Sequence, residues 1–207
     1  MRKIILLSIS FLLFIVCFTS CKSNDNVENP ERAFDYVKSI TNYISDIRIT
    51  FKNDRNEESI FLKQYISSDN KYRLDLEGER SYIYKDDKIY VKDIKNNREY
   101  FLEEDFDEVY KYSFLNEYIK LIYSMDEVNY FTESYVDGEE HKIYFAARVN
   151  LPTNNLNINY AVLYLNENYT PLKLEIFDSK DKLRVLVEYI TFDVVGEIDK
   201  SLFDYEK

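Results

Sequence analysis

The chain has 207 residues, of which 45% are hydrophobic and 31% are charged, as is typical of a folded globular protein and not of a disordered one. Three glycines and three prolines leave little material for long flexible linkers, so we expect one domain of ordinary size. The formal net charge of −11 disfavours nucleic acids and anionic lipid headgroups as partners. It suits either a partner with a basic face or solubility alone.

The first twenty residues have the order of a signal peptide. Arg2 and Lys3 form a short positive region, and residues 4–18 are almost wholly apolar. A helix of this length spans about 22 Å, which is short of the ~30 Å hydrocarbon core of a bilayer. We therefore expect residues 1–20 to be a signal peptide that is removed, with an uncleaved membrane anchor as the alternative.

The motif Phe18-Thr19-Ser20-Cys21 resembles the bacterial lipobox, with Phe18 in place of the usual leucine. The resemblance implies that Cys21 is lipidated and becomes the mature N-terminus, with residues 21–29 as a short polar tether. Cys17 would leave with the signal peptide, so the mature chain would have no thiol for a disulfide. Its net charge would be about −13, because residues 1–20 carry two positive charges and no negative one.

Two segments have the apolar spacing of amphipathic helices. Asn29-Pro30 is typical of an N-cap followed by proline in the first turn, and it predicts a helix from residue 30 to about residue 46. The second helix is expected near residues 110–124. Its apolar positions, at intervals of three and four, are Phe114, Leu115, Tyr118, Ile119 and Ile122.

Most of the remaining chain alternates between apolar and polar residues, which indicates strands with one buried face. Asp86-Asp87 and Asp137-Gly138 are predicted hairpin turns, and Glu167-Asn168 and Lys180-Asp181 are weaker ones. The strands are predicted near residues 47–54, 57–68, 70–77, 80–85, 88–94, 98–102, 128–136, 141–149, 158–166, 171–178 and 182–193.

This order predicts an α+β fold that is mainly β, formed by residues 30–207. A sheet of this size must curl, and its concave face needs a cover. We expect a curled antiparallel sheet, in the form of a half-open barrel, with the two helices covering the concave face.

The pattern resembles the LolA/LolB lipoprotein-carrier fold. One stretch that carries the resemblance is residues 72–90, with Gly78 and Tyr84-Lys85-Asp86-Asp87-Lys88. Another is residues 163–172, with Leu163-Tyr164-Leu165 and Tyr169-Thr170-Pro171-Leu172. The pattern continues to the C-terminus in Phe177-Asp178, Val187-Glu188-Tyr189, Phe192, Ile198-Asp199 and Leu202-Phe203. Such patterns support a fold and not an activity.

Together with the lipobox, this fold pattern resembles the spore germination lipoprotein family GerS of clostridia. The resemblance implies a protein without enzymatic activity that binds the cortex amidase CwlD, a zinc-dependent N-acetylmuramoyl-L-alanine amidase. The pair would make the muramic lactam that marks spore cortex for degradation. It also implies a location on the extracytoplasmic face of the cell membrane or on the spore membrane that faces the cortex. A homodimer remains open.

The sequence offers little for catalysis, a cofactor or a metal, and we expect none of them. His141 is the only histidine, and a zinc site needs three or four ligands. The acidic groups Glu103-Glu104-Asp105, Asp107-Glu108 and Glu139-Glu140 could in principle cleave glycosidic bonds, but each group is contiguous, and solvated loops explain them better. No glycine-rich phosphate loop and no Gly-x-Ser-x-Gly motif occurs.

Tyrosines are concentrated in the middle of the chain. They suit either strands or an interface with a partner. The residues are Tyr82, Tyr84, Tyr90, Tyr100, Tyr110, Tyr112 and Tyr118. The leading hypothesis is a tethered protein that binds a cell-wall amidase. The alternative is a lipid or lipoprotein carrier or receptor that uses an apolar concave cavity, and an enzyme acting alone comes third.

Overall fold

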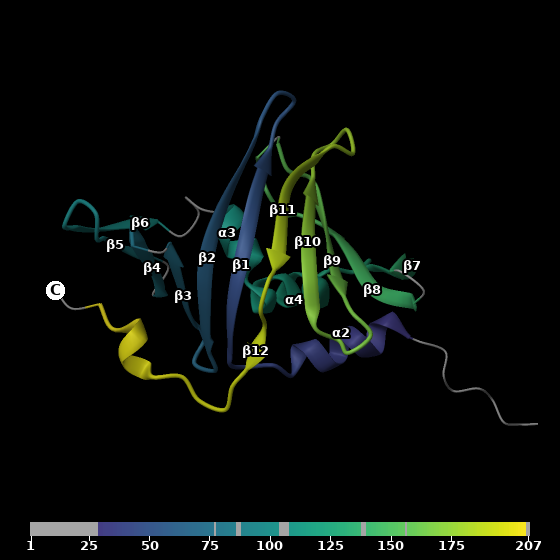
Figure 1. Ribbon diagram of the computed structural model, residues 1–207, viewed down its shortest axis with the longest axis horizontal. Helices are drawn as coiled ribbons and strands as arrows, with labels where there is room; N and C mark the ends of the chain where they lie inside the picture. Colours follow the sequence, from purple (N-terminus) through teal and green to yellow (C-terminus); the bar gives the residue numbers. More distant parts are fainter. Residues whose placement is uncertain are drawn as a thin grey trace, which may run out of the picture.

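The computed structural model describes residues 29–76, 78–85, 88–103, 108–137, 140–155 and 157–205. They form one antiparallel sheet of twelve strands with three α-helices (Figure 1). The strands are β1 (Tyr43–Lys52), β2 (Glu57–Ser67), β3 (Lys71–Leu76), β4 (Arg80–Lys85), β5 (Lys88–Asp93), β6 (Arg98–Glu103), β7 (Asn129–Asp137), β8 (Glu140–Asn150), β9 (Tyr160–Leu165), β10 (Pro171–Phe177), β11 (Leu183–Tyr189) and β12 (Asp193–Val194). The helices are α2 (Pro30–Lys38), α3 (Glu108–Ser113) and α4 (Leu115–Ser124), and a short 3₁₀ helix, η2 (Lys200–Phe203), follows the last strand.

The strand order is β6-β5-β4-β3-β2-β1-β11-β10-β9-β8-β7, with β12 paired to the start of β1. The first and last thirds of the chain therefore meet at the pair β1–β11, where Arg48 lies opposite Glu188. The sheet ends at β6 on one side and at β7 on the other, so the barrel is not closed. In Figure 1 α3 and α4 lie behind the central strands, on the concave face, and α2 lies at the lower ends of β9 and β10. We call the opposite face the outer face.

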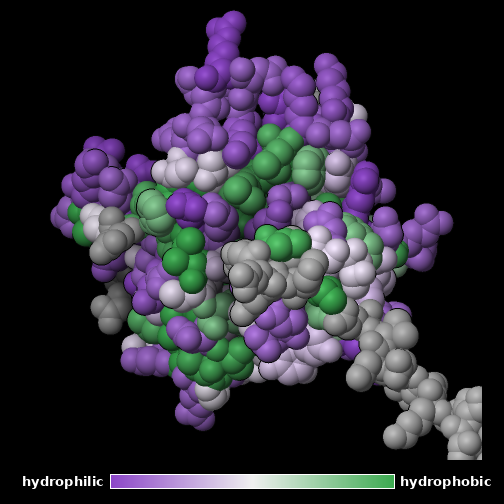
Figure 2. Space-filling model, turned by 45° about the vertical axis from the view of Figure 1, so that its right-hand side comes forward, coloured by the Kyte–Doolittle hydropathy of each residue, from purple (hydrophilic) through white to green (hydrophobic). Residues whose placement is uncertain are grey.

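Alternation along most strands decides which face is buried, whereas β9 is buried on both faces. In β1, Tyr43, Ile47 and Ile49 are buried towards the helices, whereas Arg48 is only partly buried and faces outwards. Polar residues gather at the hairpin tips, which form the hydrophilic top of the molecule in Figure 2. The predicted fold class is confirmed: the protein is mainly β, with a curled, half-open antiparallel sheet and helices on its concave face.

Helix α2 begins as predicted and ends earlier. The Asn29 side chain accepts a hydrogen bond from the backbone N–H of Glu31 at 3.0 Å and caps the helix, and Pro30 occupies the first turn. The prediction that the helix continues to about residue 46 was wrong, because Tyr43 begins β1. Ile44 fits the helical spacing, but pairing of this segment with β2, β11 and β12 decides its conformation.

The second predicted helix is two helices, which makes three in all instead of the two expected. The chain is extended at Phe114, between α3 and α4, and the Phe114 side chain makes no capping hydrogen bond to α4. Two buried tyrosines from the sheet hold this junction. The Tyr43 hydroxyl accepts the N–H of Leu115 at 2.9 Å, and the Tyr189 hydroxyl donates to the carbonyl of Ser113 at 2.8 Å.

Side chains fill the space between α4 and the sheet. Tyr118 is completely buried, and its hydroxyl lies 3.0 Å from the carbonyl oxygen of Ala147 and 2.9 Å from that of Ala161. Leu115 and Ile122 on the same helix are also buried, within one cluster that includes core residues of β1 and of β8 to β11. This part of the concave face is a packed core.

All eleven predicted strands are present, with bounds within a few residues of the prediction. Glu167-Asn168 and Lys180-Asp181 lie in turns, as predicted. The predicted turn Asp86-Asp87 and the glycine of Asp137-Gly138 lie outside the described residues. The two-residue strand β12 was not distinguished from β11 in the sequence.

Candidate functional site

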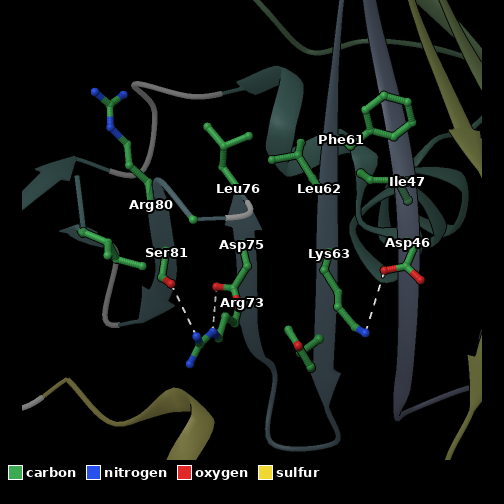
Figure 3. Close-up of a pocket in the computed structure, with 13 residues that line it drawn as sticks. Asp46, Ile47, Phe61, Leu62, Lys63, Arg73, Asp75, Leu76, Arg80 and Ser81 are labelled. Carbon is green, nitrogen blue, oxygen red and sulfur yellow. Dashed lines mark hydrogen bonds and ion pairs between the residues drawn. The ribbon is translucent and has the colours of Figure 1, made fainter.

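The outer face contains a pocket of about 550 Å³ at the point where β3 separates from β2. Strand β2 pairs with β1 over residues 57–66, but with β3 only over residues 62–67. Leu62 and Leu76 form the last described pair of the β2–β3 ladder, and both residues line the pocket. We call this cavity the outer pocket; Figure 3 shows its lining.

Charged side chains line the outer pocket in pairs. Arg73 Nε lies 2.8 Å from Asp75 Oδ1, and Lys63 Nζ lies 3.8 Å from Asp46 Oδ1 (Figure 3). These side chains share a face because each alternates with core residues of its own strand. Within these two pairs each cation has an acidic partner, so they add no net charge to the pocket wall.

Arg73 also connects the pocket to the C-terminal segment. Its Nη1 donates to the carbonyl of Leu202 at 2.8 Å, and its Nη2 lies 3.3 Å from Ser81 Oγ. Beside these contacts Phe203 is only 2% exposed, and the Tyr205 ring packs on that of Tyr90 at 4.6 Å. The C-terminal segment therefore lies across the outer face of β3 to β5 and forms one border of the site.

A third cation, Arg80, lies at the far side of the pocket. Its Nε is 3.3 Å from Asp93 Oδ2, and the Asp93 side chain is almost completely buried. Hydrogen bonds donated by Asn96 lower the pKa of the Asp93 carboxyl and keep it charged. The Arg80–Asp93 pair therefore persists over the physiological pH range.

Apolar side chains complete the outer pocket. Phe61 and Ile94 are 60% and 52% exposed, which is unusual for residues of their size. Phe61 lies in β2 and Ile94 follows β5, and Leu76 of β3 lies between these strands in the sheet order. An apolar centre with a rim of paired charges has the composition of a protein-binding surface.

Most residues singled out in the sequence lie elsewhere. Cys21, the lipobox and the signal peptide precede the described residues. His141 lies in β8, but its side chain is outside the described part of the structure. Of the acidic groups, Glu103 ends β6 and Glu108 begins α3, while Glu104, Asp105, Asp107 and Glu139 lie outside the description, and Glu140 begins β8.

The tyrosines divide between the core and the surface. Tyr84, Tyr112 and Tyr118 are buried, and Tyr100 is 37% exposed. Across the described ranges, no group of three or more His, Cys, Asp or Glu side chains is arranged to hold a metal ion. No helix among the described residues is long and apolar enough to cross a membrane.

The outer pocket itself was not predicted. The alternation of Arg73 and Asp75 with Tyr72 and Leu74 in the sequence does place both charges on the outer face. The separation of β3 from β2, which creates the pocket, has no comparable signal.

A family model described as sporulation protein YdcC-like matches residues 1–203. The chain belongs to this family. None of the curated proteins matches it.

Several solved structures are similar in fold. An uncharacterized conserved protein from Thermus thermophilus is 11% identical, with 86% of this chain and 94% of that chain covered and a TM-score of 0.54. The complex of the CwlD amidase with the GerS lipoprotein from Clostridioides difficile contains a chain 21% identical, with coverage of 83% and 98% and a TM-score of 0.46. A LolA superfamily protein from Nitrosomonas europaea is 9% identical, with coverage of 85% and 97% and a TM-score of 0.43. These likenesses concern the fold alone.

Proposed function

We propose that this sporulation-family protein is a lipoprotein that binds and supports a cortex N-acetylmuramoyl-L-alanine amidase and has no enzymatic activity of its own. Lipid on Cys21 would tether residues 30–207 to the extracytoplasmic face of the cell membrane, or to the spore membrane that faces the cortex. Membership of the YdcC-like family supports the sporulation role. The amidase as partner follows from the resemblance to the GerS family.

The outer pocket is the observation that best supports a binding role. Its apolar residues Phe61 and Ile94 are exposed on the outer face, and salt-bridged pairs such as Arg73–Asp75 surround them. A partner that covers the pocket would bury apolar area without leaving an unpaired charge, and unpaired buried charges are the costly ones. The acidity of the whole chain suits a partner with a basic surface.

The binding role is tested with the detergent-solubilised lipoprotein and a purified cortex amidase. We expect a dissociation constant of micromolar or tighter, because a hot spot of exposed aromatic and aliphatic side chains is available. Phe61→Ser should weaken binding about tenfold, whereas Ile190→Ser, at a similarly exposed residue that does not line the pocket, should leave it unchanged. No binding between folded proteins at about 10 µM would contradict the proposal.

The absence of enzymatic activity has its own test. The lipoprotein alone, incubated with cortex peptidoglycan, should release neither reducing ends nor free amines. Release of either by a preparation free of amidase would make the protein an enzyme and reverse this part of the proposal.

The alternative carrier function requires an apolar hollow on the concave face. Below α4 that space is filled, because Tyr118 and Ile122 pack against the sheet. We therefore place the carrier second. Stoichiometric retention of phospholipid or of an acylated peptide by the purified protein, seen by native mass spectrometry, would favour it.

A further inference from the structure

The outer pocket continues into a strand edge with no described neighbour. Over residues 57–61, β2 pairs with β1 on one side, and no described residue pairs with the other side. We call residues 57–61 the β2 edge. Glu57, Glu58 and Ser59 on this edge are exposed.

The direction of the backbone groups along this edge follows from β1. The Asp46 carbonyl accepts the N–H of Ile190 at 2.8 Å, and the Asp46 N–H donates to Thr191 Oγ1 at 3.0 Å. The N–H and C=O groups of Asp46 therefore both point away from β2. Every second residue of a strand points its backbone groups to the same side, so Arg48 and Thr50 do so as well. The next residue, Ile47, must then turn its groups towards β2, as must every second residue after it.

The register extends this rule to β2. Ile47 lies opposite Leu62 and Ile49 lies opposite Ile60, so these are the hydrogen-bonded pairs of the β1–β2 ladder. Leu62 and Ile60 therefore turn their backbone groups towards β1. The N–H and C=O groups of Phe61 and Ser59, which alternate with them, point away from β1. No described residue hydrogen-bonds to these groups of Ser59.

We propose that an extended segment of the partner protein adds to the β2 edge as a further strand and places an apolar side chain in the outer pocket. The inference deepens the proposed function and rests on it, because it names the surface and the chemistry of the partner segment. The added strand would continue the line of β3, which leaves β2 after the Leu62–Leu76 pair.

Three features specify this occupant. The N–H and C=O groups that alternate along the β2 edge are satisfied together only by another extended backbone. The edge ends at Phe61 and the outer pocket, so a side chain of the added strand at that level meets apolar surface. Glu57 and Glu58 are exposed on the edge, and Glu57 already pairs with Lys52 at 3.4 Å, so Glu58 is the residue that favours lysine or arginine at the other end of the segment.

A second copy of this chain is a poorer occupant of the same edge. A two-fold axis at Ser59 that pairs β2 antiparallel with its own copy would place Glu57 opposite Phe61 and Glu58 opposite Ile60, so neither glutamate would gain a cation. Each copy would also bring a net charge of −11 to the contact, and like-charged molecules repel. We therefore take the occupant to be an extended segment of the partner, with a basic residue at one end and an apolar residue at the end that meets the outer pocket.

The test is the variant Ser59→Pro in the full lipoprotein. Proline removes the N–H that faces away from β1 and leaves the pairing with β1 intact. The matched control, Ser59→Ala, removes the hydroxyl that lies 2.8 Å from Thr50 Oγ1 but keeps the N–H. We expect Ser59→Pro to weaken binding of the cortex amidase about tenfold or more, and Ser59→Ala to change it less than about twofold.

Hydrogen exchange of the unmodified lipoprotein gives a second measurement that needs no variant. The amides of residues 57–61 should exchange more slowly when the amidase is added. If the amidase binds and neither the exchange nor the Ser59→Pro affinity changes, the β2 edge is not the binding site, and the proposed function stands. If no amidase binds at all, the proposed function fails first. Slower exchange at high concentration of the lipoprotein alone would identify a second copy as the occupant and overturn the inference.

Discussion

At the scale of single residues, the most informative side chains are buried tyrosines. Tyr43, Tyr118 and Tyr189 carry their hydroxyls into the core, where each makes a hydrogen bond to the backbone. Burial raises the pKa of all three, so the hydroxyls stay protonated over any physiological pH. Tyrosine is abundant here partly because it forms strands well, and these three residues also hold the helices in position.

Tyr118→Phe tests this role. The substitution removes a hydroxyl shared by the carbonyls of Ala147 and Ala161 and leaves the ring in place. We expect the free energy of unfolding to fall by about 1–2 kcal/mol, since the carbonyls lose a partner in a dry environment. Chemical denaturation measures it. Tyr36→Phe, at a ring that is 51% exposed, is the control and should be neutral; an equal loss in both variants would refute the explanation.

At the scale of elements, capping determines where helices and turns begin. The Tyr43 hydroxyl replaces the missing side-chain cap at the start of α4, where it accepts the N–H of Leu115. In the β10–β11 turn, Asp178 accepts the N–H groups of Lys180 and Lys182 and pairs with Arg184. The β10–β11 turn thus depends on the Asp178 carboxylate as acceptor, and the start of α4 depends on the Tyr43 hydroxyl.

Tyr43→Phe should destabilise α4 by leaving the N–H of Leu115 buried without an acceptor, at about 1–3 kcal/mol. Hydrogen exchange can locate the effect, because the first turn of α4 should lose protection more than β1 itself. Uniform loss of protection over the sheet would show instead that the ring, and not the hydroxyl, is what matters.

Asp178 makes stability depend on pH. Hydrogen bonds to this carboxyl lower its pKa to about 2 from an ordinary value of 3.8. The N–H of Lys182 contributes most, and the N–H of Lys180 and the Arg184 side chain contribute less. A carboxyl with a lowered pKa stabilises the fold above its unfolded pKa, and the stabilisation is lost as the pH falls through the folded one. We expect Asp178→Asn to lower Tm by several degrees at pH 7, with the difference from the unmodified protein vanishing between about pH 4 and pH 2.

Thermal melts at pH 7, 4 and 2 measure this effect. Asp126→Asn, at an exposed carboxyl away from the turn, is the matched control. A Tm difference for Asp178→Asn that stays constant down to pH 2 would mean that the charge of Asp178 does not contribute to stability.

The sequence predicts strands better than helix ends, for physical reasons. Alternation with a period of two is clear in β1 and β2, where one face is core and the other is more exposed, whereas β9 is apolar throughout and is buried on both faces. Ile40 and Ile44 satisfy a helical spacing as well, and only the distant partners of β1 exclude the helix there. The break at Phe114 has a similar origin, since its ring packs against Tyr72 and Tyr84 from β3 and β4.

The outer pocket could not be predicted for a related reason. Its residues come from four strands, from the β3–β4 turn at Gly78 and from a later turn at Ile94. The side chains follow from alternation, but their convergence depends on where β3 leaves β2. That point is set by the curl of the whole sheet and not by any local pattern.

At the scale of the molecule, the proposed lipid anchor on Cys21 determines where the protein acts. Cys21→Ala should abolish lipidation, so that the mature domain no longer follows the membrane fraction. Detergent phase partitioning and mass spectrometry of the N-terminal peptide measure this. An unmodified thiol at Cys21 in native membranes would exclude the anchor, and the binding role would then need another route to the membrane.

The pairing of β1 with β11 has a consequence for synthesis and for the proposed export. Arg48 and Glu188 meet across this ladder although 140 residues separate them, so the centre of the sheet cannot be completed until almost the whole chain has emerged. Until then β1 to β6 can pair only with one another as a meander, and β1 lacks β11 on its other side. A chain that acquires its stability this late can cross a membrane in an unfolded state, and truncation before Leu183 should leave two halves that never join.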